Sequence, residues 1–291
     1  MNRTHCICGC PLNLEPFSEN FNALHCASCF SRHFIAKGDT SSSEFVYDGD
    51  NTKYAEEGYL YGSTLRWSHR VLLRQDWEGR KVLEIGCFNG FFLAELKKAG
   101  ATVYGFDVNP AAIAAGQKIF GLDGLHTSLD ALAALGPYDD IVCIDVIEHL
   151  DSPETLMAQL SPMLAREGRL HVAGPTIERR LHDKSDYPPH HKWWFSRDGL
   201  TTFLRTSGYR VDQILVQRDA VLMLRNCIGK VINGFGRREF HGDVTVFAPS
   251  TDGVMLGPLY KALTWVGSAL FTLLRVSYCS TVMVSKRIAP Q

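Results

Sequence analysis

A glycine loop between a strand pattern and a helix pattern constrains the fold of this chain more than any other feature. It lies in Val82-Leu-Glu-Ile-Gly-Cys-Phe-Asn-Gly-Phe-Phe92. Gly86 allows a backbone turn that a side chain would prevent, and Gly90 keeps the loop small where the next helix begins. A ligand can therefore lie against bare backbone here, as in many α/β proteins.

An acidic residue follows the next predicted strand at the spacing expected of a nucleotide site. Asp107 ends the strand predicted over Thr102–Phe106, about twenty residues beyond the loop, where a carboxylate can bind both hydroxyls of a ribose. Phe88 stands where the dinucleotide fingerprint has its second glycine, so a pyrophosphate would have no bare backbone to bind. The pattern favours a nucleoside without phosphates, and S-adenosylmethionine is the obvious candidate.

Strand and helix patterns alternate after residue 80, which predicts a mainly parallel sheet covered by helices on both faces. Ligands bind such sheets at the carboxyl ends of the strands, where Gly86, Asp107, Ser128 and Asp145 fall. The predicted strands are 81–85, 102–106, 125–127, 140–144, 168–173, 210–216 and 281–285, and the predicted helices include 54–76, 91–99, 110–119, 152–164 and 196–206.

Four motifs resemble, in order and spacing, those of class I S-adenosylmethionine-dependent methyltransferases. They are Glu84–Gly90, Gly105–Asn109, Tyr138–Leu150 and Gly168–Pro175. The resemblance implies a Rossmann-like α/β fold with a mainly parallel seven-stranded sheet. Asp145-Val-Ile-Glu-His-Leu is similar to the small-molecule O-methyltransferases of ubiquinone biosynthesis, and the Asn/Asp-Pro-Pro-aromatic sequence typical of base-amine methylation is absent from this motif.

The resemblance also implies which residues bind the cofactor. Val108 would lie against the adenine, Ser128 and Leu129 resemble the adenine-binding turn, and Glu84 would hold the glycine loop by accepting amide hydrogen bonds. Arg66 could pair with the methionine carboxylate, although an arginine on a solvated helix face explains it as well. The expected cofactor-binding residues are Glu84, Gly86, Cys87, Gly90, Asp107, Val108, Ser128, Leu129, Asp145 and Arg66.

Methyl transfer from a sulfonium needs an acceptor in line with the S–CH3 bond, and a base only where the acceptor must lose a proton. Asp145 is expected to face the methyl group, and Glu148 and His149 could deprotonate a hydroxyl or bind a divalent ion. His149 could instead cap or pack the helix that follows. His190 or His191, in a loop with two prolines and two tryptophans, is the preferred general base, although a packed structural loop explains either one alone equally well.

Five of the nine cysteines lie within the first thirty residues. Cys26-x-x-Cys29 has the spacing of a zinc knuckle, and its distance from Cys8 suits a zinc ribbon. Few apolar residues lie between the pairs, so a metal would stabilise a segment that could not otherwise fold. A metal-free leader is the other interpretation. We expect a structural zinc ion on Cys6, Cys8, Cys26 and Cys29, with His5 or Cys10 as alternatives to Cys6.

The sequence divides into a zinc-ribbon-like segment at 1–37, a linker rich in Gly, Ser and Asp at 38–53, and a methyltransferase domain at 54–291. The domain carries an insertion at about 218–280, within which 258–275 holds an apolar stretch too short to span a bilayer. This stretch could be a buried helix, a lid over an apolar substrate, or an interfacial helix in peripheral contact with a membrane.

Composition narrows the function. A net charge of −1 gives no general field for nucleic acid, and the amino terminus shows no secretory signal, so we expect a cytoplasmic protein, peripheral at the membrane if the apolar stretch is interfacial. The favoured function is methyl transfer to a hydroxyl of a small, sugar- or lipid-linked metabolite. The alternatives are an rRNA or tRNA methyltransferase that contacts RNA through the ribbon, and a non-catalytic scaffold that binds cofactor and zinc. The sequence fixes neither the acceptor nor the oligomeric state.

Overall fold

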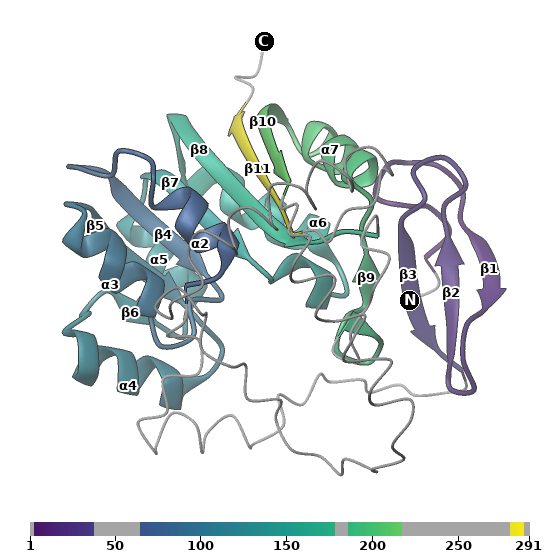
Figure 1. Cartoon of the computed structure of the whole chain (residues 1–291), viewed down its shortest axis with the longest axis horizontal. Coiled ribbons are helices and arrows are strands. Elements are labelled where there is room, and N and C mark those ends of the chain that lie inside the picture. Colours follow the sequence, from purple (N-terminus) through teal and green to yellow (C-terminus); the bar gives the residue numbers. More distant parts are fainter. Residues whose placement is uncertain (1–2, 38–64, 178–185, 217–279, 288–291) are drawn as a thin grey trace, which may run out of the picture.

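A seven-stranded sheet forms the centre of the computed structural model, which describes residues 3–37, 65–177, 186–216 and 280–287 (Figure 1). Its order is β10-β11-β8-β7-β4-β5-β6. Neighbours from β8 through β6 are parallel, whereas β11 is antiparallel to both of its neighbours. The strands are β4 (Lys81–Ile85), β5 (Thr102–Phe106), β6 (Leu125–His126), β7 (Tyr138–Ile144), β8 (Leu164–Pro175), β10 (Tyr209–Val216) and β11 (Ser280–Arg287).

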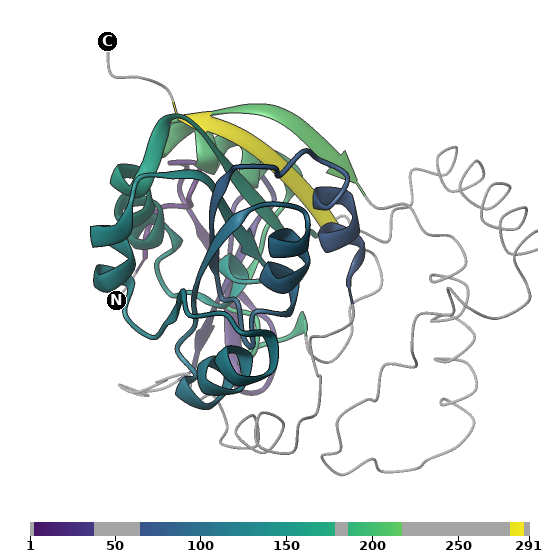
Figure 2. The same ribbon diagram turned by 90° about the vertical axis from the view of Figure 1, so that its left-hand side faces the viewer.

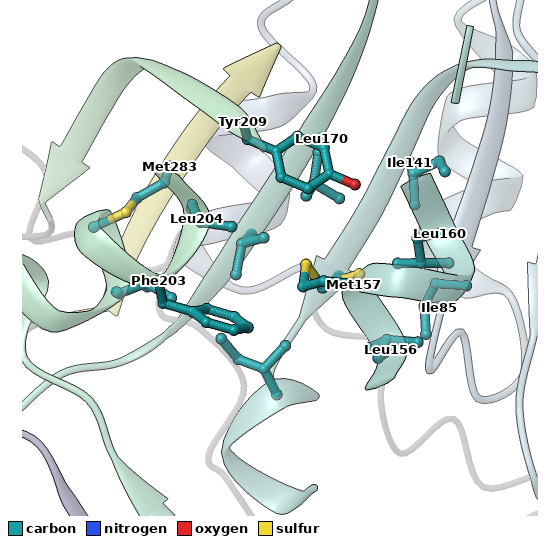
Figure 3. Packing of buried hydrophobic residues seen from close by; sticks show 14 of the residues in the cluster. Ile85, Ile141, Leu156, Met157, Leu160, Leu170, Phe203, Leu204, Tyr209 and Met283 are labelled. Carbon is teal, nitrogen blue, oxygen red and sulfur yellow. The ribbon is translucent and has the colours of Figure 1, made fainter. Parts of the chain in front are cut away.

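Helices cover both faces of this sheet because its central strands are apolar on both sides. Leu83 and Ile85 of β4 pack in one core cluster with α5 (Leu129–Leu135), α6 (Pro153–Leu160) and α7 (Arg197–Thr206). Figure 3 shows the centre of this cluster, where Met157 of α6 and Phe203 of α7 face strand residues such as Leu170. Two short 3-10 turns, η1 (Ile147–His149) and η2 (Ser161–Met163), flank α6.

The opposite face is covered by a second group of helices. Val82 of β4 packs there with residues of α2 (Trp67–Leu72), α3 (Phe91–Lys98) and α4 (Pro110–Phe120). In Figure 2 the side of the molecule that bears α3 and α4 faces the viewer. The layers thus follow from the alternation of side chains along each strand.

A separate small sheet contains the amino-terminal segment. It has the order β1-β2-β3-β9, and every pairing in it is antiparallel. Three of its strands come from the amino terminus: β1 (Asn13–Pro16), β2 (Phe21–His25) and β3 (Arg32–Ala36). The fourth, β9 (Trp193–Trp194), comes from the loop after β8, so this sheet joins two parts of the chain that lie far apart in sequence (Figure 1).

The predicted fold class is confirmed, and the sheet has the expected seven strands and mainly parallel pairing. The helix predicted over 54–76 is observed only over Trp67–Leu72, because residues up to 64 lie outside the described part and 73–76 form no helix. The linker 38–53 and nearly all of the 218–280 insertion, including 258–275, also lie outside it, so the domain boundaries stay a prediction. Among the helices that the structure describes, none has the length and apolar character needed to cross a membrane.

Candidate functional site

The glycine loop has the backbone conformation that its sequence predicts. Gly86 has φ 71° and Gly90 has φ 72°, the left-handed region that side chains rarely enter. A Cβ atom at Gly86 would lie 2.6 Å from the Val146 side chain, and one at Gly90 would lie 2.8 Å from that of Leu122. Gly90 is also the N-cap of α3. The loop therefore leaves bare backbone exposed at the carboxyl end of β4.

Asp107 lies beside this loop at the end of β5. Its Oδ2 accepts a hydrogen bond from the Phe88 amide at 2.7 Å, and its Oδ1 accepts one from the Asn109 amide at 2.9 Å. Burial raises the pKa of Asp107 above its usual range, while these amides act against that rise. The next residue, Val108, is 63% exposed. A carboxylate held by the backbone, next to an exposed apolar side chain, fits a ribose and an adenine ring.

Glu84 does not take the role expected of it. It is 4% exposed, its Oε2 has no hydrogen-bond partner among the described residues, and burial and then Asp107 raise its pKa to about 8. The loop amides bond elsewhere, since Gly86 and Cys87 both donate to the Phe106 carbonyl. The expectation that Glu84 accepts these amide hydrogen bonds is therefore wrong, because the amides reach a carbonyl of the neighbouring strand.

Three other expected cofactor residues lie at the carboxyl ends of the strands but differ in whether their side chains are exposed to solvent. The Cys87 side chain is 6% exposed and packs in the core with α3, so only its backbone belongs to the loop. Ser128 is exposed, and its hydroxyl caps α5 by accepting a hydrogen bond from the Ala131 amide at 3.3 Å. Leu129 packs against the core cluster beneath α5. Ser128 alone of the three presents a polar side chain to solvent.

Asp145 and Arg66 contact each other at the carboxyl end of β7. Asp145 follows β7 with φ 52°, a strained conformation for a non-glycine residue and one that concentrates at functional sites. Its carboxylate forms an ion pair with the guanidinium of Arg66, which is the N-cap residue of α2. The two residues expected to contact the methionine end of the cofactor therefore lie together, although 79 positions separate them in the sequence.

Glu148, His149 and His191 form a cluster, and the first two lie three and four positions after Asp145 in the chain. One potential ligand or proton-accepting atom from each lies within 4.8 Å of the others. Glu148 is 1% exposed, and no described residue forms a hydrogen bond with either of its carboxylate oxygens. Burial, followed by the charge of Asp145, raises its pKa well above its usual range. A carboxylate in this environment has a strong tendency to bind a proton or a cation.

The two histidines of the cluster are oriented by the surrounding chain. His149 Nδ1 lies 2.7 Å from the His190 carbonyl, which only accepts hydrogen bonds, so Nδ1 carries the proton and Nε2 the lone pair of the neutral ring. Burial lowers the pKa of His149 and so favours this neutral form. The His191 ring lies 4.7 Å from that of His149 in an edge-to-face arrangement. Both rings can therefore serve as bases or ligands.

The structure separates the two histidines that the sequence left equivalent. His191 is 8% exposed and joins the cluster, whereas His190 is exposed and contributes its carbonyl. Sequence reasoning gave no role to Asp186, which is buried with Oδ1 4.0 Å from His191 Nδ1. Its position at the start of the proline-histidine loop was the available signal. The alternative in which His149 only packs the next helix does not account for its proximity to Glu148 and His191.

The four cysteines expected to bind zinc also come together. The Sγ atoms of Cys6 and Cys29 lie 3.5 Å apart, as do those of Cys8 and Cys26, and all four lie within 4.8 Å of one another. A tetrahedral zinc with Zn–S bonds of about 2.3 Å requires sulfur atoms about 3.8 Å apart, so the four thiols fit such an ion. The Cys29 amide donates to Cys26 Sγ at 3.5 Å, as expected for a knuckle. His5 and Cys10 are not in this group.

Comparison with known proteins identifies the family. Residues 57–214, more than half of the chain, match the family described as a methyltransferase domain. The chain belongs to this methyltransferase family. The membership confirms the prediction that the chain carries an S-adenosylmethionine-dependent methyltransferase domain.

Curated relatives of this methyltransferase agree with the assignment. It is 29% identical over 116 residues to the mitochondrial ubiquinone biosynthesis O-methyltransferase of Schizosaccharomyces pombe, covering 37% of this chain and 42% of that protein. It is 34% identical over 110 residues to the ubiquinone biosynthesis O-methyltransferase of Brucella ovis, covering 36% of this chain and 44% of that protein. The chain thus spans less than half the length of these relatives.

Two solved structures show the same fold. One is the Burkholderia thailandensis 1,6-didemethyltoxoflavin-N1-methyltransferase, with a TM-score of 0.51 and 11% identity, covering 95% of this chain and all of that one (100%). The other comes from the complex between the Haloferax volcanii Trm112 methyltransferase activator and a methyltransferase, with a TM-score of 0.53 and 14% identity, covering 82% of this chain and 98% of that one. At these identities the likeness extends to the fold alone.

Proposed function

We propose that this protein transfers the methyl group of S-adenosylmethionine to a hydroxyl of a small molecule, free or linked to a sugar or lipid. The observation that carries the proposal is the cluster of Glu148, His149 and His191 beside Asp145. An acceptor hydroxyl must lose its proton, and this cluster offers buried proton-accepting atoms on the acceptor side of the site. The O-methyltransferase activity of the relatives from S. pombe and B. ovis supports the same chemistry.

The cofactor would occupy the carboxyl ends of β4, β5 and β7. When bound, S-adenosylmethionine supplies a methyl group already activated by its sulfonium. Asp107 would bind the ribose hydroxyls, Val108 would contact the adenine, and Gly86 would allow the ligand to approach the backbone. Arg66 would pair with the cofactor carboxylate in exchange for its contact with Asp145, which would then face the methyl group.

On the acceptor side the chain would orient a hydroxyl and remove its proton. As the C–O bond forms and the S–CH3 bond breaks, the hydroxyl proton would pass to His149 Nε2, to His191 or to Glu148. The neutral ring of His149 suits it to accept this proton, whereas Glu148, whose pKa burial raises well above its usual range, would accept a proton only while ionised. The same three residues could hold a divalent cation that lowers the pKa of the hydroxyl instead.

The amino-terminal cysteines would hold a structural zinc ion. Four thiolates complete a tetrahedral coordination sphere and leave no position for a substrate, so this ion would not take part in methyl transfer. The apolar sequence at 258–275 would suit an acceptor with a lipid-like portion if it forms a lid or an interfacial helix. Binding of the protein to vesicles of neutral phospholipid, measured by co-sedimentation, tests this finer point.

The first test is calorimetric titration with S-adenosylhomocysteine. The wild type should bind, and Asp107→Ala should bind at least about tenfold more weakly, because a charged hydrogen-bonding partner is lost. Asp123→Ala, at an exposed position in the turn after α4, is the matched control and should bind like the wild type. No binding to a folded wild type contradicts the proposal.

The second test separates the acceptor chemistries. Catechols, other phenols, sugars and transfer RNA would be offered with radiolabelled S-adenosylmethionine. The proposal is supported if the wild type methylates a hydroxyl and if Glu148→Gln and His149→Ala each lower the rate of that transfer at least about a hundredfold. Both variants should still bind S-adenosylhomocysteine as the wild type does. Loss of activity with EDTA while the ribbon zinc stays bound assigns the cluster to a cation. Transfer to RNA supports the alternative, and cofactor binding without transfer to any acceptor supports a scaffold.

A further inference from the structure

The loop that carries His191 lies between the amino-terminal segment and the methyltransferase domain. We call residues 186–196, which include β9, the histidine loop, and residues 3–37 the ribbon. Strand β9 pairs with β3 of the ribbon, with Trp193 opposite His33 and Trp194 opposite Arg32. The Phe34 amide adds a hydrogen bond of 2.8 Å to the Lys192 carbonyl. The residues directly after His191 are therefore a strand of the ribbon's own sheet (Figure 1).

Side chains reinforce this pairing. The His33 ring stacks on Trp193 with centroids 4.3 Å apart and planes 19° apart. The Arg3 guanidinium lies 4.7 Å from the centre of the Trp193 ring, and it also forms two hydrogen bonds, of 2.6 and 2.8 Å, with the Glu154 carboxylate of α6. Trp193 is 1% exposed. The ribbon thus covers the tryptophan two positions after His191.

The same loop is bonded on its other side to the acceptor cluster. The Lys192 amide donates to the Glu148 carbonyl at 2.8 Å, and Trp193 Nε1 donates to the Leu150 carbonyl at 3.0 Å. His149 donates to the His190 carbonyl. Lys192 therefore bonds through its carbonyl to the ribbon and through its amide to the backbone of Glu148.

A second connection joins the cysteines to the end of the loop. The Ser196 amide donates to Ser31 Oγ at 3.0 Å, and the Ser196 hydroxyl donates to the Cys29 carbonyl. Ser196 is also the N-cap of α7, because its Oγ accepts the Gly199 amide at 2.8 Å. One hydrogen bond thus separates a proposed zinc ligand from the residue that ends the histidine loop.

The ribbon cannot hold this position by its own apolar core. Its own small cluster has Ala23, Phe34 and Trp194 as buried members, and Trp194 belongs to the histidine loop. The ribbon's Cys6, Ile7, Cys26 and Cys29 are buried instead in the large cluster shared with α6 and α7, and three of these four are cysteines. A segment of about forty residues or fewer with so little buried apolar surface needs a metal or cross-link to fold. We therefore infer that the order of β3, and with it the pairing of β9, depends on the ion that would join the four cysteines.

We propose that zinc bound by the ribbon positions His191, and through Lys192 the Glu148 backbone, for the acceptor reaction. The zinc then positions the residues that would contact the methyl acceptor, Glu148, His149 and His191. The cofactor-binding residues, which β4, β5 and their loops carry, do not depend on it. The catalytic meaning of this position rests on the proposed function. The dependence of the His191 position on zinc does not rest on the proposed function, so an experiment can refute either one without the other.

Histidine footprinting of the full-length protein tests the link without a substrate. Diethylpyrocarbonate modifies accessible imidazoles, and mass spectrometry reports each site. In the zinc-bound protein the exposed His190 should react at least about tenfold faster than the buried His191. Release of zinc with a mercurial and EDTA should raise the His191 rate to within about threefold of the His190 rate, while S-adenosylhomocysteine affinity changes by less than about twofold.

A pair of variants keeps the test independent of zinc removal. His33→Ala removes the ring that stacks on Trp193 but no cysteine, and should speed modification of His191 by about three- to tenfold, the value of one aromatic contact. His25→Ala, on the adjacent strand, removes a ring that pairs with Glu15 and should leave the His191 rate unchanged.

Continued protection of His191 in the zinc-free protein overturns the proposal. So does simultaneous loss of S-adenosylhomocysteine binding, because it would show that zinc supports the whole fold and not only the residues that would contact the methyl acceptor. If His191 becomes reactive as expected but no hydroxyl acceptor is ever methylated, the link stands and the proposed function fails.

Discussion

Glu84 is a buried acidic residue whose ionisation should lower the stability of the fold. It is the first residue of the motif Glu84–Gly90 and is 4% exposed. Its Oε2 has no partner among the described residues, and Asp107 is close enough to raise its pKa. Its pKa rises from an ordinary 4.5 to about 8. Between these two pH values the folded chain keeps a proton that the unfolded chain has released. The free energy of unfolding therefore falls as the pH rises through this window.

The magnitude follows from the size of the window. Each unit of pKa difference is worth about 1.36 kcal/mol, and at pH 7 the protein is 2.5 units above the ordinary pKa of Glu84, so the cost is about 3 kcal/mol. Glutamine has nearly the shape of the protonated acid and cannot ionise. Glu84→Gln should therefore raise the free energy of unfolding by about 3 kcal/mol at pH 7 and by almost nothing near pH 4.5.

Urea unfolding followed by circular dichroism, with zinc saturating, measures this effect at pH 5, 6, 7 and 8. The difference between variant and wild type should grow by about 1.4 kcal/mol per pH unit between pH 5 and 7 and level off near pH 8. Glu167→Gln, at an exposed position of β8, should differ from the wild type by less than about 0.5 kcal/mol at every pH. A destabilised Glu84→Gln, or a gain that does not grow with pH, refutes the reasoning.

Three further predictions concern the core, the loop and the metal. Asp140 is fully buried, and although burial alone would raise its pKa, hydrogen bonds from His171 and Arg169 hold it at about 2. Asp140→Ala should cost about 3–5 kcal/mol in urea unfolding at pH 7, and the wild type should lose this contribution only as the pH falls from about 4 through 2. Gly90→Ala, which crowds Leu122 at positive φ, should lower the melting temperature more than Gly121→Ala, where positive φ has open space. Chromogenic chelator titration after mercurial treatment should release one zinc ion per chain, and none from Cys26→Ser.

Local backbone requirements explain why much of the fold was predictable. The strand ending at Ile85 and the one ending at Phe106 have the predicted bounds, and Gly86 has positive φ, in agreement with the predicted glycine turn. These features depend on residues that are neighbours in sequence, where steric limits and apolar runs act directly. The grouping of Cys6, Cys8, Cys26 and Cys29 was predictable for a related reason, since short spacings restrict where thiols can lie.

The acceptor side was less predictable because it depends on contacts between distant segments. The sequence nominated His149, His190 and His191 without ranking them, and only the packing of the histidine loop brings His191 to Glu148 and turns His190 outward. Glu84 shows that a local motif can also predict a contact that the tertiary structure does not form. Its motif suggested amide partners, yet the neighbouring strand supplies the Phe106 carbonyl to those amides first.

The amino-acid sequence by itself determined the α/β class, the glycine loop, the acid at Asp107 and the cysteine set, because each is a short-range pattern with a strong conformational or chemical preference. Only the tertiary structure decided that Arg66 meets Asp145, that His191 joins Glu148, and that β9 becomes a strand of the ribbon sheet. Those contacts join residues from 43 positions apart, Glu148 and His191, to 162 positions apart, Arg32 and Trp194. Their formation depends on how whole layers pack, which no local pattern encodes.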